Sequence, residues 1–362
     1  MVEYTIDSLL RKTVELGASD LHFICGEVPS FRIDGKILKS KLPPVTQEDV
    51  IGAINDIVPF AMRDKVFKAY DADFPYEIEG VARFRVNMAM TFGCHSMTIR
   101  VVPYEIPTFN QLGLPDKIEK FSHFENGIVL VTGVAGSGKS TTIASILNHI
   151  NNTYKKHIVT VEDPIEYVYK SNKSIFTQRQ IGIDTPHFLD GLKYALRQDP
   201  NVILIGEIRD RETIQSALHA AETGHLVFAT LHTYNAIQTI NRVLSFFDPT
   251  ERDLVRSQFS EVFRGTISQK LLPKLDGKGR VAAVEMLFST PTIKDFIIKD
   301  ELEQIYKLVQ KGGYNDMITF NQSLHSLIKS GAISKDIALE NSDAPNELMH
   351  LIRGVYSGSE GL

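Results

Sequence analysis

The feature that most constrains the fold is a glycine-rich motif, Gly133–Ser140, which has the sequence GVAGSGKS. It matches G-x-x-x-x-G-K-[ST] at every fixed position, follows the apolar run Ile128–Val131, and precedes a stretch with the apolar spacing of a helix, residues 141–147. In a strand–loop–helix of this kind, successive backbone N–H groups and the helix N-terminus face bound phosphates. The motif therefore predicts a nucleoside triphosphate site in an α/β domain.

Each part of the motif has an expected role in binding ATP and Mg²⁺. Lys139 would reach the β- and γ-phosphates, and the Ser140 hydroxyl would ligate Mg²⁺. The glycines allow the backbone to curl so that its N–H groups point at the phosphates. We expect the nucleotide to be bound by Gly133, Gly136, Ser137, Gly138, Lys139, Ser140 and Thr141.

The composition is that of an ordinary globular protein and argues against a nucleic-acid partner. The 362 residues suffice for two or three domains, and 43% are hydrophobic and 23% charged. The net charge is −5 without a dense stripe of Lys or Arg, so the electrostatic surface of a nucleic-acid binder is missing. No apolar run approaches the roughly 20 residues that span a bilayer, and the start does not resemble a signal peptide. Cys25 and Cys94 lack metal-type spacing, and these features together predict a cytoplasmic protein.

The first part of the chain, residues 1–102, is predicted to be an α+β domain. Helical spacing covers residues 5–16 and 46–69, the latter interrupted near Pro59. Period-2 alternation and turn residues predict strands at 20–24, 30–37, 83–88 and 95–100. Three prolines then punctuate a predicted linker, residues 103–116, because proline extends neither a helix nor a central strand.

A second domain, residues 117–291, alternates strand and helix patterns. The predicted strands are Ile128–Val131, Ile158–Val161, Val202–Ile205 and Leu226–Thr230. A predicted helix over residues 213–222 has its apolar residues on one face. This alternation is typical of a mostly parallel sheet covered on both sides. The remaining residues, 292–362, have mainly helical patterns.

Polar residues follow three of these predicted strands. Glu162 follows the strand at 158–161, Glu207 the strand at 202–205, and His232 the strand at 226–230. Ligands of open α/β sheets bind beyond the carboxyl ends of the strands, so these side chains are expected to lie near the glycine loop. They are the candidate catalytic residues of the second domain.

ATP hydrolysis needs Mg²⁺, a group that orients the attacking water, and cations for the developing charge. Glu207 resembles the glutamate that follows a Walker B strand, and Glu162 is a second candidate for orienting water. Gly206 stands where many P-loop proteins have the Mg²⁺-binding aspartate, so Glu207 or a water takes that position. His232, and less directly His225, could sense the γ-phosphate or link strands at a subunit boundary.

With these motifs assembled, the chain resembles the type IV pilus retraction ATPases, the PilT and PilU group of the secretion ATPase superfamily (GspE/PulE/VirB11-like). The likeness runs through nearly the whole chain. The segments that carry it are residues 17–22, 31–35, 83–87, 133–140, 161–166, 196–200, 206–210 and 221–233.

The resemblance implies a PAS-like N-terminal domain, a RecA-like ATPase domain, and a homohexamer with nucleotide between neighbouring subunits. It implies that arginines of the N-terminal domain reach the phosphates, and the matching positions are Arg85 and Arg100, with Arg83 less well matched. It also implies a motor at the cytoplasmic face of the bacterial inner membrane. There it would act on a membrane platform protein of the pilus and could work with a paralogous pilus ATPase.

Two features bear on the direction of the motor. Pilus-assembly and type II secretion ATPases of this superfamily usually carry a four-cysteine zinc insertion, whereas residues 269–280 contain no cysteine, which excludes such a zinc site there. This favours retraction of the pilus over its assembly. The segment 292–300 departs from the tail helix of PilT proteins, which leaves open whether the chain is the main motor or an accessory regulatory paralogue.

Overall fold

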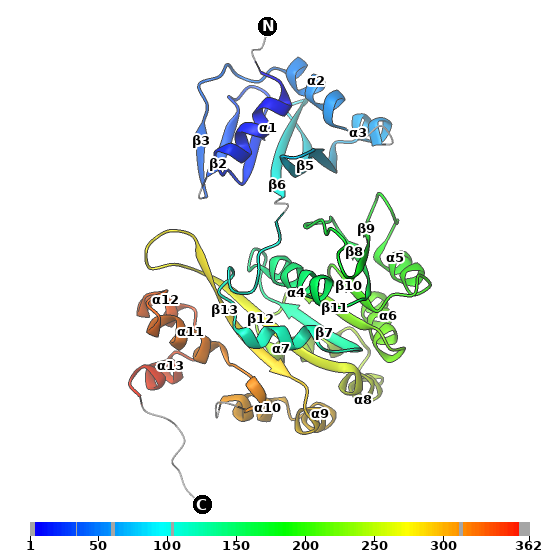
Figure 1. Cartoon of the computed structure of the whole chain (residues 1–362), viewed down its shortest axis with the longest axis vertical. Helices are drawn as coiled ribbons and strands as arrows, with labels where there is room; N and C mark the ends of the chain where they lie inside the picture. Colours follow the sequence, from blue (N-terminus) through cyan, green and yellow to red (C-terminus); the bar gives the residue numbers. More distant parts are fainter. Residues whose placement is uncertain (1–3, 34, 59–61, 103–104, 311–313, 355–362) are drawn as a thin grey trace, which may run out of the picture. The chain divides into compact units, whose positions relative to one another are not determined.

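The computed structural model describes residues 4–33, 35–58, 62–102, 105–310 and 314–354. The chain divides into two compact units, residues 1–105 and 106–362 (Figure 1). Within the described ranges, none of the helices combines the length and apolar character needed to cross a membrane.

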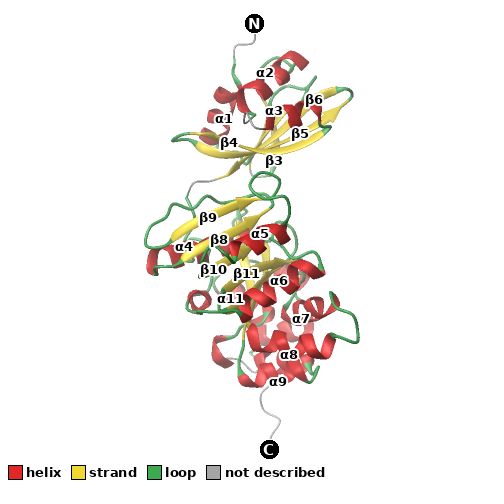
Figure 2. Ribbon diagram, turned by 90° about the vertical axis from the view of Figure 1, so that its right-hand side faces the viewer, coloured by secondary structure: helices red, strands yellow, loops and turns green. Residues whose placement is uncertain are grey.

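The first unit is built on a six-stranded antiparallel sheet in the order β3-β2-β1-β6-β5-β4. Three helices, α1 (Ile6–Glu15), α2 (Gln47–Ile57) and α3 (Arg63–Lys68), pack on one face of this sheet (Figure 2). The strands are β1 (Asp20–Phe23), β2 (Ser30–Ile33), β3 (Lys36–Lys39), β4 (Asp71–Ile78), β5 (Ala82–Thr91) and β6 (Cys94–Val102).

Period-2 alternation gives this sheet one apolar and one polar face. Phe84, Val86 and Met88 of β5 are fully buried beneath the helices, so the intervening Arg83 and Arg85 lie on the opposite face. The helices begin where Thr5 and Thr46 form capping boxes. The predicted hairpin of residues 83–88 and 95–100 is confirmed as part of β5 and β6, whereas β4 was missed because Pro75 and three acidic residues obscure its pattern.

The second unit contains a seven-stranded sheet in the order β13-β12-β7-β11-β10-β8-β9. Six strands run parallel, and β13 pairs antiparallel with β12 at one edge. The strands are β7 (Gly127–Thr132), β8 (His157–Glu162), β9 (Ile175–Gln180), β10 (Val202–Ile205), β11 (Leu226–Leu231), β12 (Phe263–Pro273) and β13 (Arg280–Phe288). The four strands predicted for this region are all present as β7, β8, β10 and β11.

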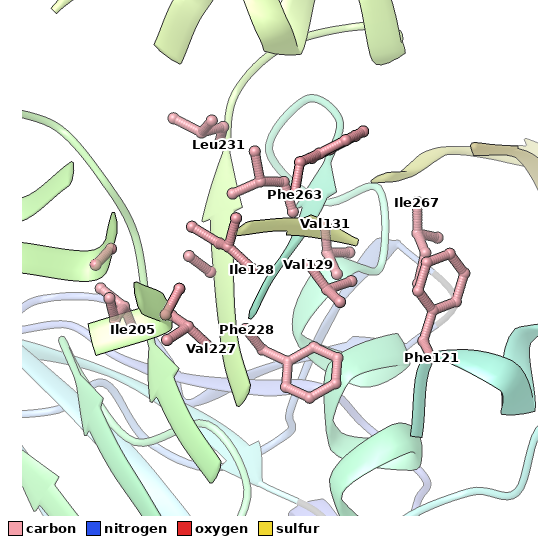
Figure 3. Packing of buried hydrophobic residues seen from close by; sticks show 14 of the residues in the cluster. Phe121, Ile128, Val129, Val131, Ile205, Val227, Phe228, Leu231, Phe263 and Ile267 are labelled. Carbon is pink, nitrogen blue, oxygen red and sulfur yellow. The ribbon is translucent and has the colours of Figure 1, made fainter. Parts of the chain in front are cut away.

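Helices cover both faces of the parallel strands, with α4 on one side and α5 and α6 on the other (Figure 2). Every residue of β7 and β11 is therefore buried, as expected for strands that read as continuous apolar runs. Figure 3 shows side chains of β7, β11 and β12 packed in this core, among them Ile128, Val129, Val131, Val227, Phe228 and Ile267. The helices are α4 (Lys139–Thr153), α5 (Phe188–Ala195), α6 (Arg211–Glu222), α7 (Ala236–Ser245) and α8 (Arg252–Val262).

Helices also follow the sheet, as the patterns after residue 291 predict. They are α9 (Pro291–Ile298), α10 (Leu302–Gln310), α11 (Phe320–Lys329), α12 (Lys335–Glu340) and α13 (Pro345–Ile352). The segment predicted as a linker, residues 103–116, differs from expectation, because from Ile106 on it belongs to the second unit. Leu114 is buried in the core of that unit, and Ile106, Phe109 and Leu112 pack against it. The apolar residues between the prolines account for this packing.

Candidate functional site

The glycine-rich loop joins β7 to α4, and the backbone conformation of the loop explains why glycine occupies these positions. Gly133, Gly136 and Gly138 have φ of 143°, 75° and 90°, a region that other residues rarely adopt. A Cβ at Gly133 would lie 2.4 Å from the backbone oxygen of Gln269, and one at Gly138 would lie 2.8 Å from its side-chain Nε2. The loop therefore packs closely against β12, and only glycine fits at these two positions.

Two polar side chains of the loop are buried in a way that suits an anionic ligand. The Lys139 ammonium donates hydrogen bonds to the carbonyl oxygens of Gly133 (2.8 Å) and Val134 (3.0 Å). Burial lowers the pKa of Lys139, against the opposing charges of Glu166 and Glu207. The buried Ser137 Oγ has no hydrogen-bond partner among the described residues. A bound phosphate would supply both groups with an acceptor.

The first turn of α4 is tied to the neighbouring segments by hydroxyl groups. Thr141 Oγ1 lies 2.9 Å from the Tyr167 hydroxyl, and Thr142 Oγ1 donates to Gln269 Oε1 at 2.7 Å. Gln269 therefore contacts both the loop and the helix that follows it. The sequence analysis missed this residue because nothing in a strand 130 residues away marks it as a neighbour of the loop.

The three strand ends that carry polar residues lie side by side. In the parallel register, Ile205 pairs with Val161 on one side and Ala229 on the other, so Glu162, Gly206 and Thr230 follow at the same level. The Gly206 N–H donates to the Val161 carbonyl at 2.8 Å, and Thr230 Oγ1 donates to the Gly206 carbonyl at 2.5 Å. A Cβ at Gly206 would approach Glu162 Cα to 3.2 Å. A side chain such as aspartate is therefore disfavoured at this position.

Glu207 and His232 come together at this edge, as the sequence predicted. The Glu207 side chain is only 13% exposed, and its Oε2 lies 3.6 Å from His232 Nε2. Its Oε1 accepts from Arg209 Nη2 at 2.5 Å, a partner that the sequence analysis did not single out. Since the Glu207 charge also acts on Lys139, this carboxylate lies within electrostatic range of the loop that would hold the phosphates.

Glu162 lies at the same edge in a different environment. Burial raises the pKa of Glu162 to about 7, although the side chains of Thr160 and Gln178 oppose the shift. Its Oε1 has no hydrogen-bond partner in the described part of the chain. The carboxylates whose charge acts on Lys139 are Glu207 and Glu166, the latter expected to be structural. The two glutamates thus differ in environment: Glu207 contacts Arg209 and His232, whereas Glu162 is buried.

The other histidine considered, His225, lies at the amino end of β11. Its Nδ1 is 2.9 Å from the Ala220 carbonyl oxygen, and its own carbonyl accepts from the Gly127 N–H at 3.0 Å. It therefore joins the end of α6 to the starts of two strands. His225 thus lies at the opposite end of the sheet from the glycine loop of its own chain, which follows the carboxyl end of β7.

Arg85 and Arg100 lie in the first unit, directly opposite each other on β5 and β6. Each is held by an aspartate, with Arg85 Nε 3.3 Å from Asp73 Oδ1 and Arg100 Nε 2.8 Å from Asp20 Oδ1. Burial would raise the pKa of Asp20, but hydrogen bonds from Ser19 and Arg100 outweigh it and lower that pKa. The Arg100 side chain remains 64% exposed, so its guanidinium is fixed at one edge and open to a further partner.

Known proteins resemble this chain over most of its length. The sequence profile of the family described as Type II/IV secretion system protein matches residues 1–330. The Type IV pilus retractation ATPase PilT of Pseudomonas aeruginosa is 43% identical over 340 residues, covering 94% of this chain and 98% of that protein. The Type IV pilus ATPase PilU of the same organism is 37% identical over 351 residues, covering 96% and 91%. A crystal structure of the pilus retraction motor PilT with bound ADP matches with a TM-score of 0.89 at 44% identity, covering 96% of this chain and 100% of that one.

Proposed function

The chain belongs to the Type II/IV secretion system protein family, and from this premise we propose that it is an ATP-hydrolysing motor that retracts type IV pili. The observation that carries the enzymatic part is the glycine-rich loop between β7 and α4, whose left-handed glycines and buried Lys139 and Ser137 side chains suit bound phosphates. The likeness to PilT, which covers nearly all of both chains at 43% identity, supports retraction.

ATP would be held at the N-terminus of α4. The backbone of the glycine loop would surround the phosphates, Lys139 would contact the β- and γ-phosphates, and Thr141 would lie at the helix start. The buried Lys139 ammonium and the Ser137 hydroxyl, which has no partner among the described residues, support this fit. The Ser140 hydroxyl would hold Mg²⁺, with Glu207 contributing through a water molecule, and the metal would supply positive charge to the phosphate oxygens.

Glu207 would orient the attacking water. Its carboxylate is kept in place by Arg209 and His232, whereas the Oε1 of the neighbouring Glu162 has no hydrogen-bond partner in the described part of the chain. Burial raises the pKa of Glu162 to about 7, which suits a general base near neutral pH, so Glu162 is the alternative for this role. His232, which touches Glu207, would sense the state of the γ-phosphate through that contact.

The first unit would act as a PAS-like domain and the second as a RecA-like ATPase domain. The antiparallel sheet with helices on one face and the parallel sheet with a glycine loop support these assignments. In a homohexamer with nucleotide between neighbouring subunits, Arg85 and Arg100 would supply positive charge to the transition state. Hydrolysis around such a ring would act on a platform protein of the inner membrane, from its cytoplasmic face.

A second candidate is an accessory retraction ATPase that modifies a main motor. The likeness to PilU, 37% identity over 96% of this chain, favours it over an assembly motor. The departing segment 292–300 forms α9 and packs on α8, where Lys294 Nζ lies 3.0 Å from Glu261 Oε2. This segment lies outside the nucleotide site, so a change there would affect coupling or partner docking more than hydrolysis.

Deletion of the gene in the source organism tests the direction of the motor. We expect mutant cells to keep or over-display surface pili while losing twitching motility, and purified protein to form hexamers that hydrolyse Mg-ATP slowly. Loss of pili from the mutant would assign the chain to assembly. Unchanged retraction in the mutant, with a second motor present, would assign it the accessory role.

A further inference from the structure

The two cysteines of the chain come together in the first unit, although they are 69 positions apart in the sequence. Cys25 follows β1 and Cys94 is the first residue of β6, the strand that pairs with β1. The Cys25 N–H donates to Ser96 Oγ at 3.3 Å, which places Cys25 beside the start of β6.

The start of α2 locates both residues independently. Cys25 forms a β-bridge with Val45, and the Cys94 thiol contacts Gln47 Oε1 at 3.7 Å. Val45 and Gln47 flank Thr46, the N-cap of α2, so both cysteines lie against the same short segment. The two cysteines therefore lie on neighbouring strand ends and contact residues two positions apart, so both are held in the same part of the first unit.

The thiols interact and are accessible. A hydrogen bond to the Cys94 side chain raises the pKa of Cys25, and burial adds to this rise. Both residues are partly exposed and neither is in a disulfide. Because a raised pKa makes a thiol a poorer nucleophile, Cys94 is the expected first nucleophile of the pair.

We propose that Cys25 and Cys94 form a reversible intramolecular disulfide when the protein meets a peroxide. The Cys94 thiolate attacks one peroxide oxygen, the O–O bond breaks, and Cys94 becomes a sulfenic acid while one water leaves. The Cys25 sulfur then attacks the Cys94 sulfur, the S–O bond breaks, and the hydroxyl departs as a second water with the Cys25 proton. Two thiols are thereby oxidised and one peroxide is reduced, and an external dithiol reverses the reaction by exchange.

The bond would join the strands that also present Arg100. In the β1–β6 register, Asp20 pairs with Arg100, and three further pairs lead to the end where the cysteines lie. Oxidation would therefore link β1 and β6 covalently at one end, while Asp20 holds the Arg100 guanidinium at the other end of this strand pair. The modification itself does not depend on the proposed motor function.

Mass spectrometry of the full-length protein tests the proposal. Reduced protein is treated with a small excess of hydrogen peroxide, denatured, and alkylated with N-ethylmaleimide. We expect a mass lower by about 2 Da, no alkylation at either cysteine, and recovery of two alkylated thiols after dithiothreitol. The digested protein should yield a cross-linked peptide pair containing Cys25 and Cys94.

Single substitutions supply the matched controls. Cys25→Ser and Cys94→Ser should not lose about 2 Da, and dimedone should trap the sulfenic acid in Cys25→Ser more readily than in Cys94→Ser. Oxidised wild-type protein should also melt at a higher temperature than reduced protein, a shift that both variants lack. A wild-type mass that rises by about 16 Da per oxidised thiol, or a disulfide between two chains, would overturn the proposal.

Discussion

The two units hold their candidate site residues by opposite means. In the second unit, Lys139 and Glu207 lie largely out of solvent at the edge of a parallel sheet, enclosed by backbone. In the first unit, Arg85 and Arg100 stand on the open face of an antiparallel sheet and are oriented by aspartates. A charge in a dry site interacts strongly with a ligand, whereas an exposed charge is screened until a partner excludes water from it.

This difference indicates that the two units contribute at different stages. In the proposed function, the loop and the strand ends of the second unit would bind the nucleotide within one chain. The charges of Arg85 and Arg100 in the first unit would act strongly on a ligand only when a partner excludes water from them. Substitutions should therefore abolish function directly in the second unit, while those in the first unit should be open to rescue by a neighbouring subunit.

The largest effect is expected for Lys139→Ala. Removing the ammonium leaves the charge of the β- and γ-phosphates uncompensated, so ATP hydrolysis should fall by at least about 1,000-fold. Phosphate release from Mg-ATP measures the change. Lys155→Ala, which removes an exposed lysine just beyond the end of the same helix, should retain wild-type turnover. Equal turnover of Lys139→Ala and wild type would contradict the assignment of the glycine-rich loop as the ATP site.

The double variant Arg85→Ala, Arg100→Ala should lose about three orders of magnitude in turnover, because a cation that stabilises transition-state charge raises the rate by about that factor. Mixing it with Lys139→Ala protein should restore part of the activity, since each subunit supplies what its neighbour lacks. Mixed rings can be verified by mass spectrometry of differently tagged chains. Verified mixed rings without any rescue would show that each site is built within one chain.

A matched pair of substitutions separates the two glutamates. Glu207→Gln should bind ATP and lose about 100-fold or more in turnover, because an amide cannot take up a proton from the attacking water. Glu162→Gln should cost less than about 10-fold, since the proposed function assigns the attacking water to Glu207, which Arg209 and His232 hold in place. ATP binding and single-turnover hydrolysis give both values. The reverse ranking would move the water-orienting role to Glu162.

The burial of Glu162 also predicts a dependence of stability on pH. Its pKa is about 7 in the folded protein and near 4.5 when unfolded, so the folded state binds this proton more tightly. The resulting stabilisation is complete below pH 4.5 and is lost as pH rises through 7. Relative to wild type, Glu162→Gln should therefore gain roughly 3 kcal/mol in unfolding free energy between pH 4.5 and 8.

Urea unfolding of both proteins across this range measures the difference. Glu285, another buried carboxyl with a pKa of about 7, contributes the same slope to both proteins and cancels. A difference in unfolding free energy that stays constant with pH would show that Glu162 is ionised in the folded state throughout.

The smallest effect is expected where an aspartate positions an exposed arginine. Asp20→Asn weakens the anchor of Arg100, and turnover should fall by about 3- to 10-fold without loss of ATP binding. Asp73→Asn is the comparison, because Asp73 and Arg85 are both well exposed and the pair is worth less. Steady-state kinetics at low and high salt measures both variants. A larger loss for Asp73→Asn than for Asp20→Asn would contradict this ranking.

The sequence by itself determined the features that depend on neighbouring residues. The glycine loop, its lysine and the residues after β8, β10 and β11 are read from contiguous motifs, and parallel strands necessarily end at a common edge. The half-buried hairpin that carries Arg85 and Arg100 follows from strict alternation. None of these features requires knowledge of a distant contact.

Only the tertiary structure decided the features that join distant segments. Gln269 contacts Thr142 at the start of α4 across 127 positions, Asp20 anchors Arg100 across 80 positions, and Cys25 lies near Cys94. It also showed that Glu207 and Glu162, two glutamates near the ends of neighbouring strands, have different surroundings. The physical reason is that burial and charge at a side chain come from whatever packs around it, and no spacing along the chain encodes those neighbours.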